Sequence, residues 1–91
     1  MDARTILGWN VRRLRVEKGL SQERLALAAG IDRAYVGRIE RGSENVTIAR
    51  LEDLARVLGI PIAALFEAPM GKQRPAGLPS GRRRKAAPRP A

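Results

Sequence analysis

Residues 22–39 read QERLALAAGIDRAYVGRI, and five of them stand at offsets that constrain the fold: Gln22, Ala26, Gly30, Val36 and Ile39. The small side chain of Ala26 lets two helices approach closely, and Gly30 can adopt the left-handed backbone that ends a helix. Val36 and Ile39 are three residues apart and therefore share the inward face of the second helix. This spacing predicts two short helices that cross at a tight turn, one of them free to enter a DNA groove.

The amino-acid composition limits the classes of function. The chain has 91 residues, no cysteine and no histidine. This length allows one small domain, and the missing residue types remove disulfides, thiolate metal sites and the commonest general base. Neither paired carboxylates nor a nucleophile–base set stands out, so we expect no enzyme and no cofactor. The apolar runs are too short for a bilayer and residues 1–20 do not read as a signal peptide, so we expect a cytoplasmic, nucleoid-associated protein without a membrane partner.

The net charge of +9 is unevenly placed along the chain. Residues 1–71 hold 11 Lys/Arg against nine Asp/Glu, whereas residues 72–91 hold seven Lys/Arg and no acid. Five of the six prolines fall from Pro69 onward. We therefore predict a DNA-binding and dimerisation domain over residues 1–68, followed by a disordered Pro/Arg-rich basic tail over residues 69–91. Added non-specific phosphate affinity, recruitment of another protein and solubility are all open roles for this tail.

Apolar spacing and capping residues predict five helices. Leu7, Val11 and Leu14 stand at i, i+4 and i+7 and form an inward stripe on the first helix. Ser, Asp and Thr favour helix N-caps, so Ser21, Asp32 and Thr47 are expected to begin the second, third and fourth helices. The fourth helix is expected to carry one apolar face of Ile48, Leu51, Leu54, Ala55 and Leu58. The first helix is expected over about residues 4–18, the second ends at Gly30, the third reaches residue 40 or 41, and Gly59 closes the fourth. Pro61 suits the first turn of a short fifth helix that carries Ile62, Leu65 and Phe66.

The exposed face of the third helix is where function should concentrate. With Val36 and Ile39 inward, this face comprises Arg33, Ala34, Tyr35, Gly37, Arg38 and Arg41. A guanidinium can donate two parallel hydrogen bonds to O6 and N7 of guanine, so Arg33 and Arg38 are the main candidates to read bases. Contact with phosphate, or simple solvation, is the alternative for both arginines. Ala34 and Tyr35 could touch a thymine methyl, while Tyr35 could instead bind a phosphate or pack as a structural residue.

Four further side chains are candidates for contact with the DNA backbone. Gln22 lies at the start of the second helix, where free amides and the helix dipole favour a phosphate. Its own amide could bind that phosphate or brace a side chain of the third helix, and the alternative is a plain first-turn residue that makes no contact. Arg41, Ser43 and Asn45 follow the third helix and would lie near the backbone of the same half-site. We therefore predict phosphate contacts at all four positions.

One recognition helix per chain reads only about half a binding site, which favours a two-fold symmetric dimer. The candidate interface residues lie at the end of the domain and are Ile60, Ile62, Leu65 and Phe66. The alternative is that all four only close the core of a single chain. We expect a division, with Ile62 or Leu65 in the interface and the rest inside. Trp9 falls off the apolar stripe of the first helix and is expected to be mostly exposed, as a partner contact or as a partly covered surface residue.

Several consecutive motifs resemble one known family. The chain resembles the phage-repressor (Cro/C1, XRE) helix-turn-helix family over residues 6–66. The resemblance lies in SQERLALAAGIDRAYVGRIERG (21–42) and TIARLEDLARVLGIPIAALF (47–66). Two shorter motifs typical of the family are LRVEKGLSQ (14–22) and RIERG (38–42). The resemblance implies an all-α, five-helix, lambda-repressor-like domain that binds operators as a homodimer. It also implies a partly buried ion pair between Arg15 and Glu40. Arg24 departs from the acidic residue common in the family, which puts the cap of the second helix in doubt.

A narrower resemblance is also present. The stretch DRAYVGRIERG (32–42), together with Asn45, is similar to small controller proteins of restriction–modification systems. The primary hypothesis is a sequence-specific transcriptional regulator that binds double-stranded DNA as a homodimer on a palindromic operator and controls its own gene. RNA polymerase is a further expected partner if the bound dimer activates. The alternatives are an antitoxin that binds both operator DNA and a toxin protein, and a non-specific nucleic-acid-binding protein dominated by the basic tail.

Overall fold

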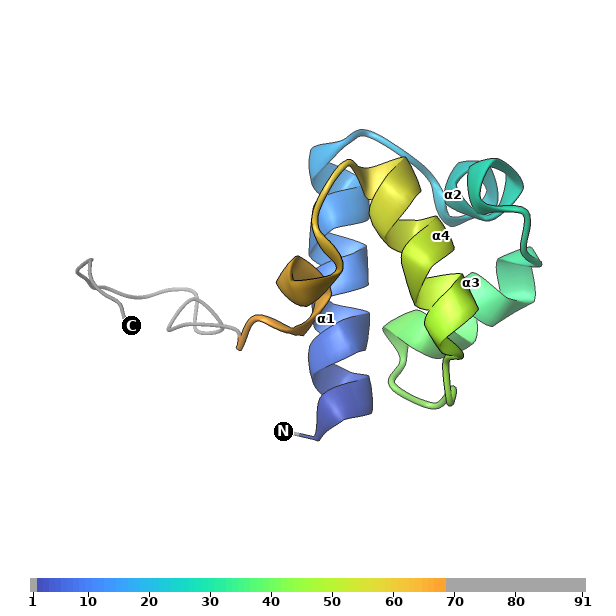
Figure 1. The fold of residues 1–91 in the computed structure, drawn as a ribbon. Helices are drawn as coiled ribbons and strands as arrows, with labels where there is room; N and C mark the ends of the chain where they lie inside the picture. Colours follow the sequence, from blue (N-terminus) through green and yellow to red (C-terminus); the bar gives the residue numbers. More distant parts are fainter. Residues whose placement is uncertain (1, 69–91) are drawn as a thin grey trace.

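The computed structural model describes residues 2–68, which form four α-helices and a terminal 3₁₀ helix (Figure 1). No strand occurs within that range. The all-α prediction is therefore confirmed, except that the expected fifth α-helix is a 3₁₀ helix. Met1 and the predicted disordered tail over 69–91 lie outside the described residues. The elements are α1 (Ala3–Glu17), α2 (Gln22–Ala29), α3 (Arg33–Glu40), α4 (Ile48–Leu58) and η1 (Ile62–Phe66).

Short polar side chains define where the helices begin. Ser21 Oγ accepts a hydrogen bond from the backbone N–H of Arg24 at 3.0 Å, so the cap survives the arginine at that position. Thr47 Oγ1 caps α4 in the same way. Asp32 precedes α3 as expected, but its side chain makes no capping hydrogen bond. Gly30 ends α2 with φ +71°, the left-handed conformation that the sequence predicts there.

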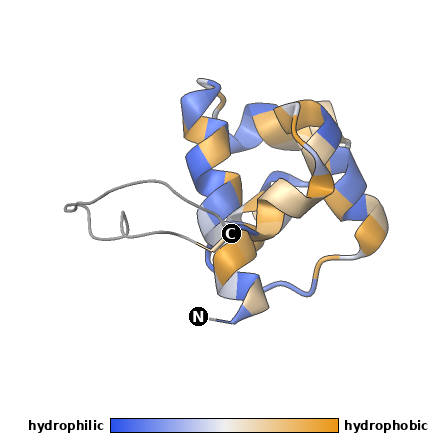
Figure 2. Cartoon of the chain, turned by 60° about the vertical axis from the view of Figure 1, so that its left-hand side comes forward, coloured by the Kyte–Doolittle hydropathy of each residue, from blue (hydrophilic) through white to orange (hydrophobic). Residues whose placement is uncertain are grey.

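The core lies where the faces of the four helices meet. α1 packs against α3 and η1, and α2 packs against α3 and α4. Hydrophobic and hydrophilic residues alternate along the helices, as an amphipathic bundle requires (Figure 2). Ile48 was expected on the inward face of α4, but it is 71% exposed because the first turn of that helix extends beyond the core. The core side chains with at most 1% exposure are Val11, Leu25, Val36, Ile39, Leu54 and Leu65.

One buried amide fastens η1 to α1. Asn10 is 1% exposed, and its Nδ2 donates to the backbone oxygens of Leu65 at 2.9 Å and Glu67 at 2.8 Å. Buried backbone carbonyls need such donors, because an unpaired one costs about 1–3 kcal/mol. The end of the domain is therefore held to the first helix by a side chain that the sequence analysis did not single out.

Replacing Asn10 by Ala is expected to destabilise the domain by about 2 kcal/mol, because two carbonyl oxygens lose their donor. Urea unfolding followed by circular dichroism measures the change. Asn45→Ala is the matched control, since that exposed amide makes only a 3.5 Å contact with Arg4. It should change stability by no more than about 0.5 kcal/mol. Equal effects of the two substitutions would show that Asn10 does not anchor η1.

No helix among residues 2–68 is both long enough and apolar enough to cross a membrane.

Candidate nucleic-acid interface

The second helix of the crossed pair, α3, has one buried face and one open face. Val36 and Ile39 are 0% and 1% exposed, which confirms their predicted inward position. Arg33 and Ala34 are exposed at the start of the helix, and Tyr35 and Arg38 are half-buried. Gly37 was expected on the open face but is buried.

The burial of Gly37 has a physical reason. A Cβ at that position would lie 3.4 Å from Nη1 of Arg41, so the long side chain of Arg41 covers the glycine. The open face of α3 is therefore narrower than the sequence predicts. Its side chains with polar or cationic groups are Arg33, Tyr35, Arg38 and Arg41.

A hydrogen-bonded cluster at the end of α3 joins side chains of α1, α2 and α3, namely Arg15, Gln22 and Glu40. The carboxylate of Glu40 accepts two hydrogen bonds from Arg15, at 2.7 Å from Nε and 3.1 Å from Nη2. The two side chains are only 13% and 6% exposed, so the predicted pair is present and largely buried. This contact raises the pKa of Arg15 above its ordinary value, mainly through the hydrogen bond to Glu40. Arg15 also donates from Nη1 to the backbone oxygen of Leu20 at 2.9 Å.

Gln22 completes this cluster. Its Nε2 donates to Oε1 of Glu40 at 3.0 Å. The structure thus places this amide in the bracing arrangement, one of the alternatives that the sequence left open, and its contact with a phosphate stays a prediction. The start of α2 and the end of α3 are tied through one carboxylate, which fixes their crossing.

Arg38 takes part in a second, more exposed pair. Its Nε donates to Oε1 of Glu44 at 2.6 Å, and its Cζ lies 5.6 Å from the centre of the Tyr35 ring. The hydrogen bond to Glu44 is the main cause that raises the pKa of Arg38. Sequence reasoning missed Glu44, because a loop residue six positions away follows no helical spacing. In the sequence, only the position of this acidic residue, close after the RIERG motif, indicated that it could contact the third helix.

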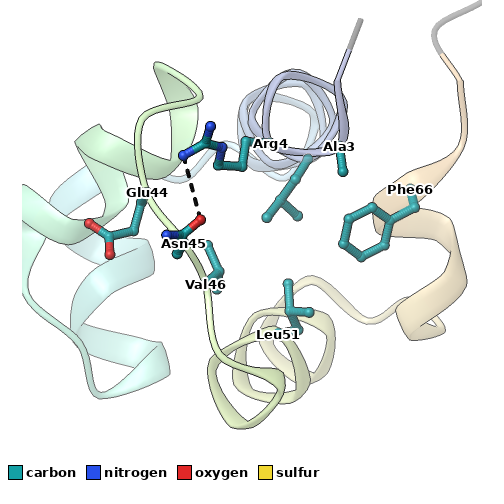
Figure 3. Close-up of a pocket in the computed structure, with 8 residues that line it drawn as sticks. Ala3, Arg4, Glu44, Asn45, Val46, Leu51 and Phe66 are labelled. Carbon is teal, nitrogen blue, oxygen red and sulfur yellow. Dashed lines mark hydrogen bonds between the residues drawn. The ribbon is translucent and has the colours of Figure 1, made fainter.

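The segment after α3 carries the other three residues that are predicted to contact DNA phosphates. Arg41, Ser43 and Asn45 are all exposed. Ser43 Oγ donates to the backbone oxygen of Arg38 at 3.3 Å, and Arg4 of α1 reaches Oδ1 of Asn45 at 3.5 Å (Figure 3). The loop is therefore hydrogen-bonded to the end of α3, and its Asn45 side chain lies beside the start of α1.

The four candidate interface residues separate into two groups. Leu65 is fully buried in the core and is therefore not available to an interface, which leaves Ile62 of the two residues expected there. Ile60 is partly buried against the core, inside the domain as expected. Ile62 and Phe66 are 38% and 41% exposed, so Phe66 does not lie inside as expected. Trp9 is 36% exposed and lines a shallow groove on α1, which agrees with a partly covered surface tryptophan.

This arrangement matches that of known proteins. The family model HTH_3, described as helix-turn-helix, matches residues 11–65. The Neisseria hypothetical transcription factor from Neisseria meningitidis serogroup B is 41% identical over 68 residues, or 75% of this chain. The match spans 64% of that relative, just under two thirds of its length.

Two crystal structures of other proteins share the fold. The restriction-modification controller protein C.AhdI from Aeromonas hydrophila is 46% identical, with a TM-score of 0.68 over 69% of this chain and 96% of that one. SinR, a master regulator for biofilm formation solved in complex with DNA, is 34% identical, with a TM-score of 0.65 over 67% of this chain and 98% of that one. This chain belongs to the HTH_3 (XRE-type) helix-turn-helix family of DNA-binding transcription regulators, which are not enzymes.

Proposed function

We propose that this regulator acts as a homodimer on a palindromic operator, with α3 as the recognition helix in the major groove. The observation that carries the proposal is that α3 has an exposed arginine, Arg33, at its start and a largely buried carboxylate, Glu40, at its end. Glu40 holds that end through Arg15 and Gln22. A helix fixed in this way presents its open face in one orientation, which base-specific hydrogen bonds require.

Individual residues take the following roles in this proposal. Arg33 and Arg38 bind base edges, and Ala34 and Tyr35 contact the neighbouring bases. The loop residues Arg41, Ser43 and Asn45 are exposed beside α3, where the backbone of the same half-site would run. Phosphate contacts of this kind fix the register of a protein on DNA, whereas base contacts specify the sequence.

Dimerisation would place the two recognition helices about 34 Å apart, one turn of DNA. The side chains that would form the interface are Ile62 and Phe66, because large apolar residues on a single surface element favour association. Repression follows where the operator overlaps a promoter, and activation where the bound dimer also contacts RNA polymerase. The proposal includes an operator upstream of the gene for this protein, which would make it autoregulatory.

Ile62→Glu is expected to weaken the dimer at least tenfold, because a charge would be buried at the interface. Sedimentation equilibrium across a range of protein concentrations measures the dissociation constant. Leu27→Glu is the matched control, since Leu27 is a 76% exposed apolar residue on α2, outside the proposed interface. A dimer that both substitutions weaken equally, or that neither weakens, would place the interface elsewhere.

Selection of binding sites from a random DNA library tests the proposed function. We expect enrichment of two inverted half-sites about one helical turn apart, and a match to this motif upstream of the gene. Failure to enrich any sequence at physiological salt would contradict the proposal. That result would favour the alternative in which the basic tail provides non-specific affinity.

A further inference from the structure

Glu44 lies in the loop between α3 and α4 and holds one of the two arginines proposed to read bases. Its carboxylate accepts from Nε of Arg38 at 2.6 Å. The Glu44 side chain is 22% exposed and that of Arg38 is 44% exposed, so the pair lies at the edge of the open face. In Figure 3 the carboxylate points away from the apolar side chains of Leu51 and Phe66.

The position of this contact on the guanidinium matters. The carboxylate of Glu44 accepts the hydrogen bond of Nε, and the Cζ of Arg38 lies over the ring of Tyr35. Neither Nη of Arg38 donates a hydrogen bond to any residue from 2 to 68. Those two nitrogens are the fork that can donate in parallel to O6 and N7 of guanine. The ion pair therefore fixes the arginine at its inner end and leaves the base-reading end open.

The charge of Glu44 has a second consequence. An unpaired arginine beside DNA is attracted to any phosphate, and each such contact adds affinity that does not depend on sequence. A carboxylate at hydrogen-bond distance balances the charge of Arg38 and weakens this attraction. Directional hydrogen bonds from the two Nη atoms to a base remain available, since they do not require a net charge.

We propose that Glu44 is a specificity-determining positioning residue, which aims the guanidinium of Arg38 end-on at a guanine and suppresses its binding to phosphates. This inference rests on the proposed function, because it needs Arg38 to contact a base. Glu44 acts through Arg38 and does not itself need to touch DNA.

The test compares Glu44→Ala with Glu44→Gln. The experiment measures affinity for the selected site, for the site with each half-site base pair changed in turn, and for unrelated DNA. Glu44→Ala should reduce the base preference about fivefold or more at one half-site position, the same position that Arg38→Ala relaxes. Glu44→Gln keeps an oxygen that accepts from Nε, so it should retain part of this preference. Both variants should bind unrelated DNA more tightly, with a salt slope steeper by about 0.9 for each additional phosphate that the protein neutralises.

Glu52→Ala is the matched control, because it removes the same charge from an exposed position on α4. It should leave the base preference at that half-site position unchanged. If Arg38→Ala relaxes one position while Glu44→Ala relaxes none, the inference is wrong and the proposed function stands. If the wild-type protein prefers no sequence, the proposed function fails and the inference fails with it.

Discussion

Gly8→Ala is expected to lower the free energy of unfolding by about 3 kcal/mol, at the upper end of the range for overpacking a core. A Cβ on Gly8 would collide with the backbone oxygen of Ile39 and would lie 2.8 Å from that of Glu40. Both atoms belong to the backbone at the end of α3, so no side-chain rotation can relieve the collision. α1 would have to move away from α3, and with it the buried contact between Arg15 and Glu40.

Gly37→Ala is the matched control for this prediction. The nearest atom to a Cβ there is Nη1 of Arg41 at 3.4 Å, at the free end of a flexible side chain. Replacing a glycine in the middle of a helix by alanine stabilises the folded protein by about 0.5–1 kcal/mol, so this variant should be at least as stable as the wild type. Urea unfolding of both variants measures the difference. A Gly8→Ala protein as stable as Gly37→Ala would mean that α1 and α3 do not approach as closely as described.

Glu40→Ala is expected to destabilise the domain by about 3 kcal/mol, because it leaves the guanidinium of Arg15 largely buried without its carboxylate. Arg15 keeps its hydrogen bond to the backbone of Leu20, which places the loss at the lower end of the range for such pairs. Gln22 loses its acceptor at the same time. The loss is best measured as the urea midpoint at constant slope, so that a change in compactness is not mistaken for one in stability.

A surface ion pair on α1 provides the comparison for Glu40. Arg13 and Glu17 lie 3.3 Å apart with side chains 34% and 61% exposed, and exposed pairs contribute only about 0–1 kcal/mol. Glu17→Ala should therefore cost less than about 1 kcal/mol. The burial of the Glu40 cluster is the property under test. It would be contradicted if Glu40→Ala were no more harmful than Glu17→Ala.

The parts of the fold that could be predicted from the sequence are those with local causes. The N-caps at Ser21 and Thr47 and the left-handed Gly30 follow from the conformational preferences of single residues. The inward positions of Val36 and Ile39 follow from helical periodicity. The Arg15–Glu40 pair was implied only by the family resemblance, since residues 25 positions apart have no periodic relation.

Features that join distant segments could not be predicted in this way. Gly8 has to lack a side chain because the backbone at the end of α3 lies against it, and Asn10 is needed as a donor to the backbone of η1. Neither contact can be inferred from the neighbouring residues in the sequence. Ile48 fits the apolar spacing of α4, but periodicity does not show where the core ends along a helix. Leu65 and Phe66 are neighbours in an apolar segment, yet only the packing against α1 distinguishes the buried one from the exposed one.

The central claim is that α3 reads DNA sequence through Arg33. The most direct measurement is the ratio of affinities for the selected operator and for a scrambled duplex of the same length, at fixed salt. Arg33→Ala should lower this ratio about tenfold or more, because a bidentate contact with guanine discriminates by about 1–3 kcal/mol. Arg24→Ala removes the same charge from an exposed position on α2 and should leave the ratio unchanged. Equal losses of affinity on the two duplexes for Arg33→Ala would contradict the claim.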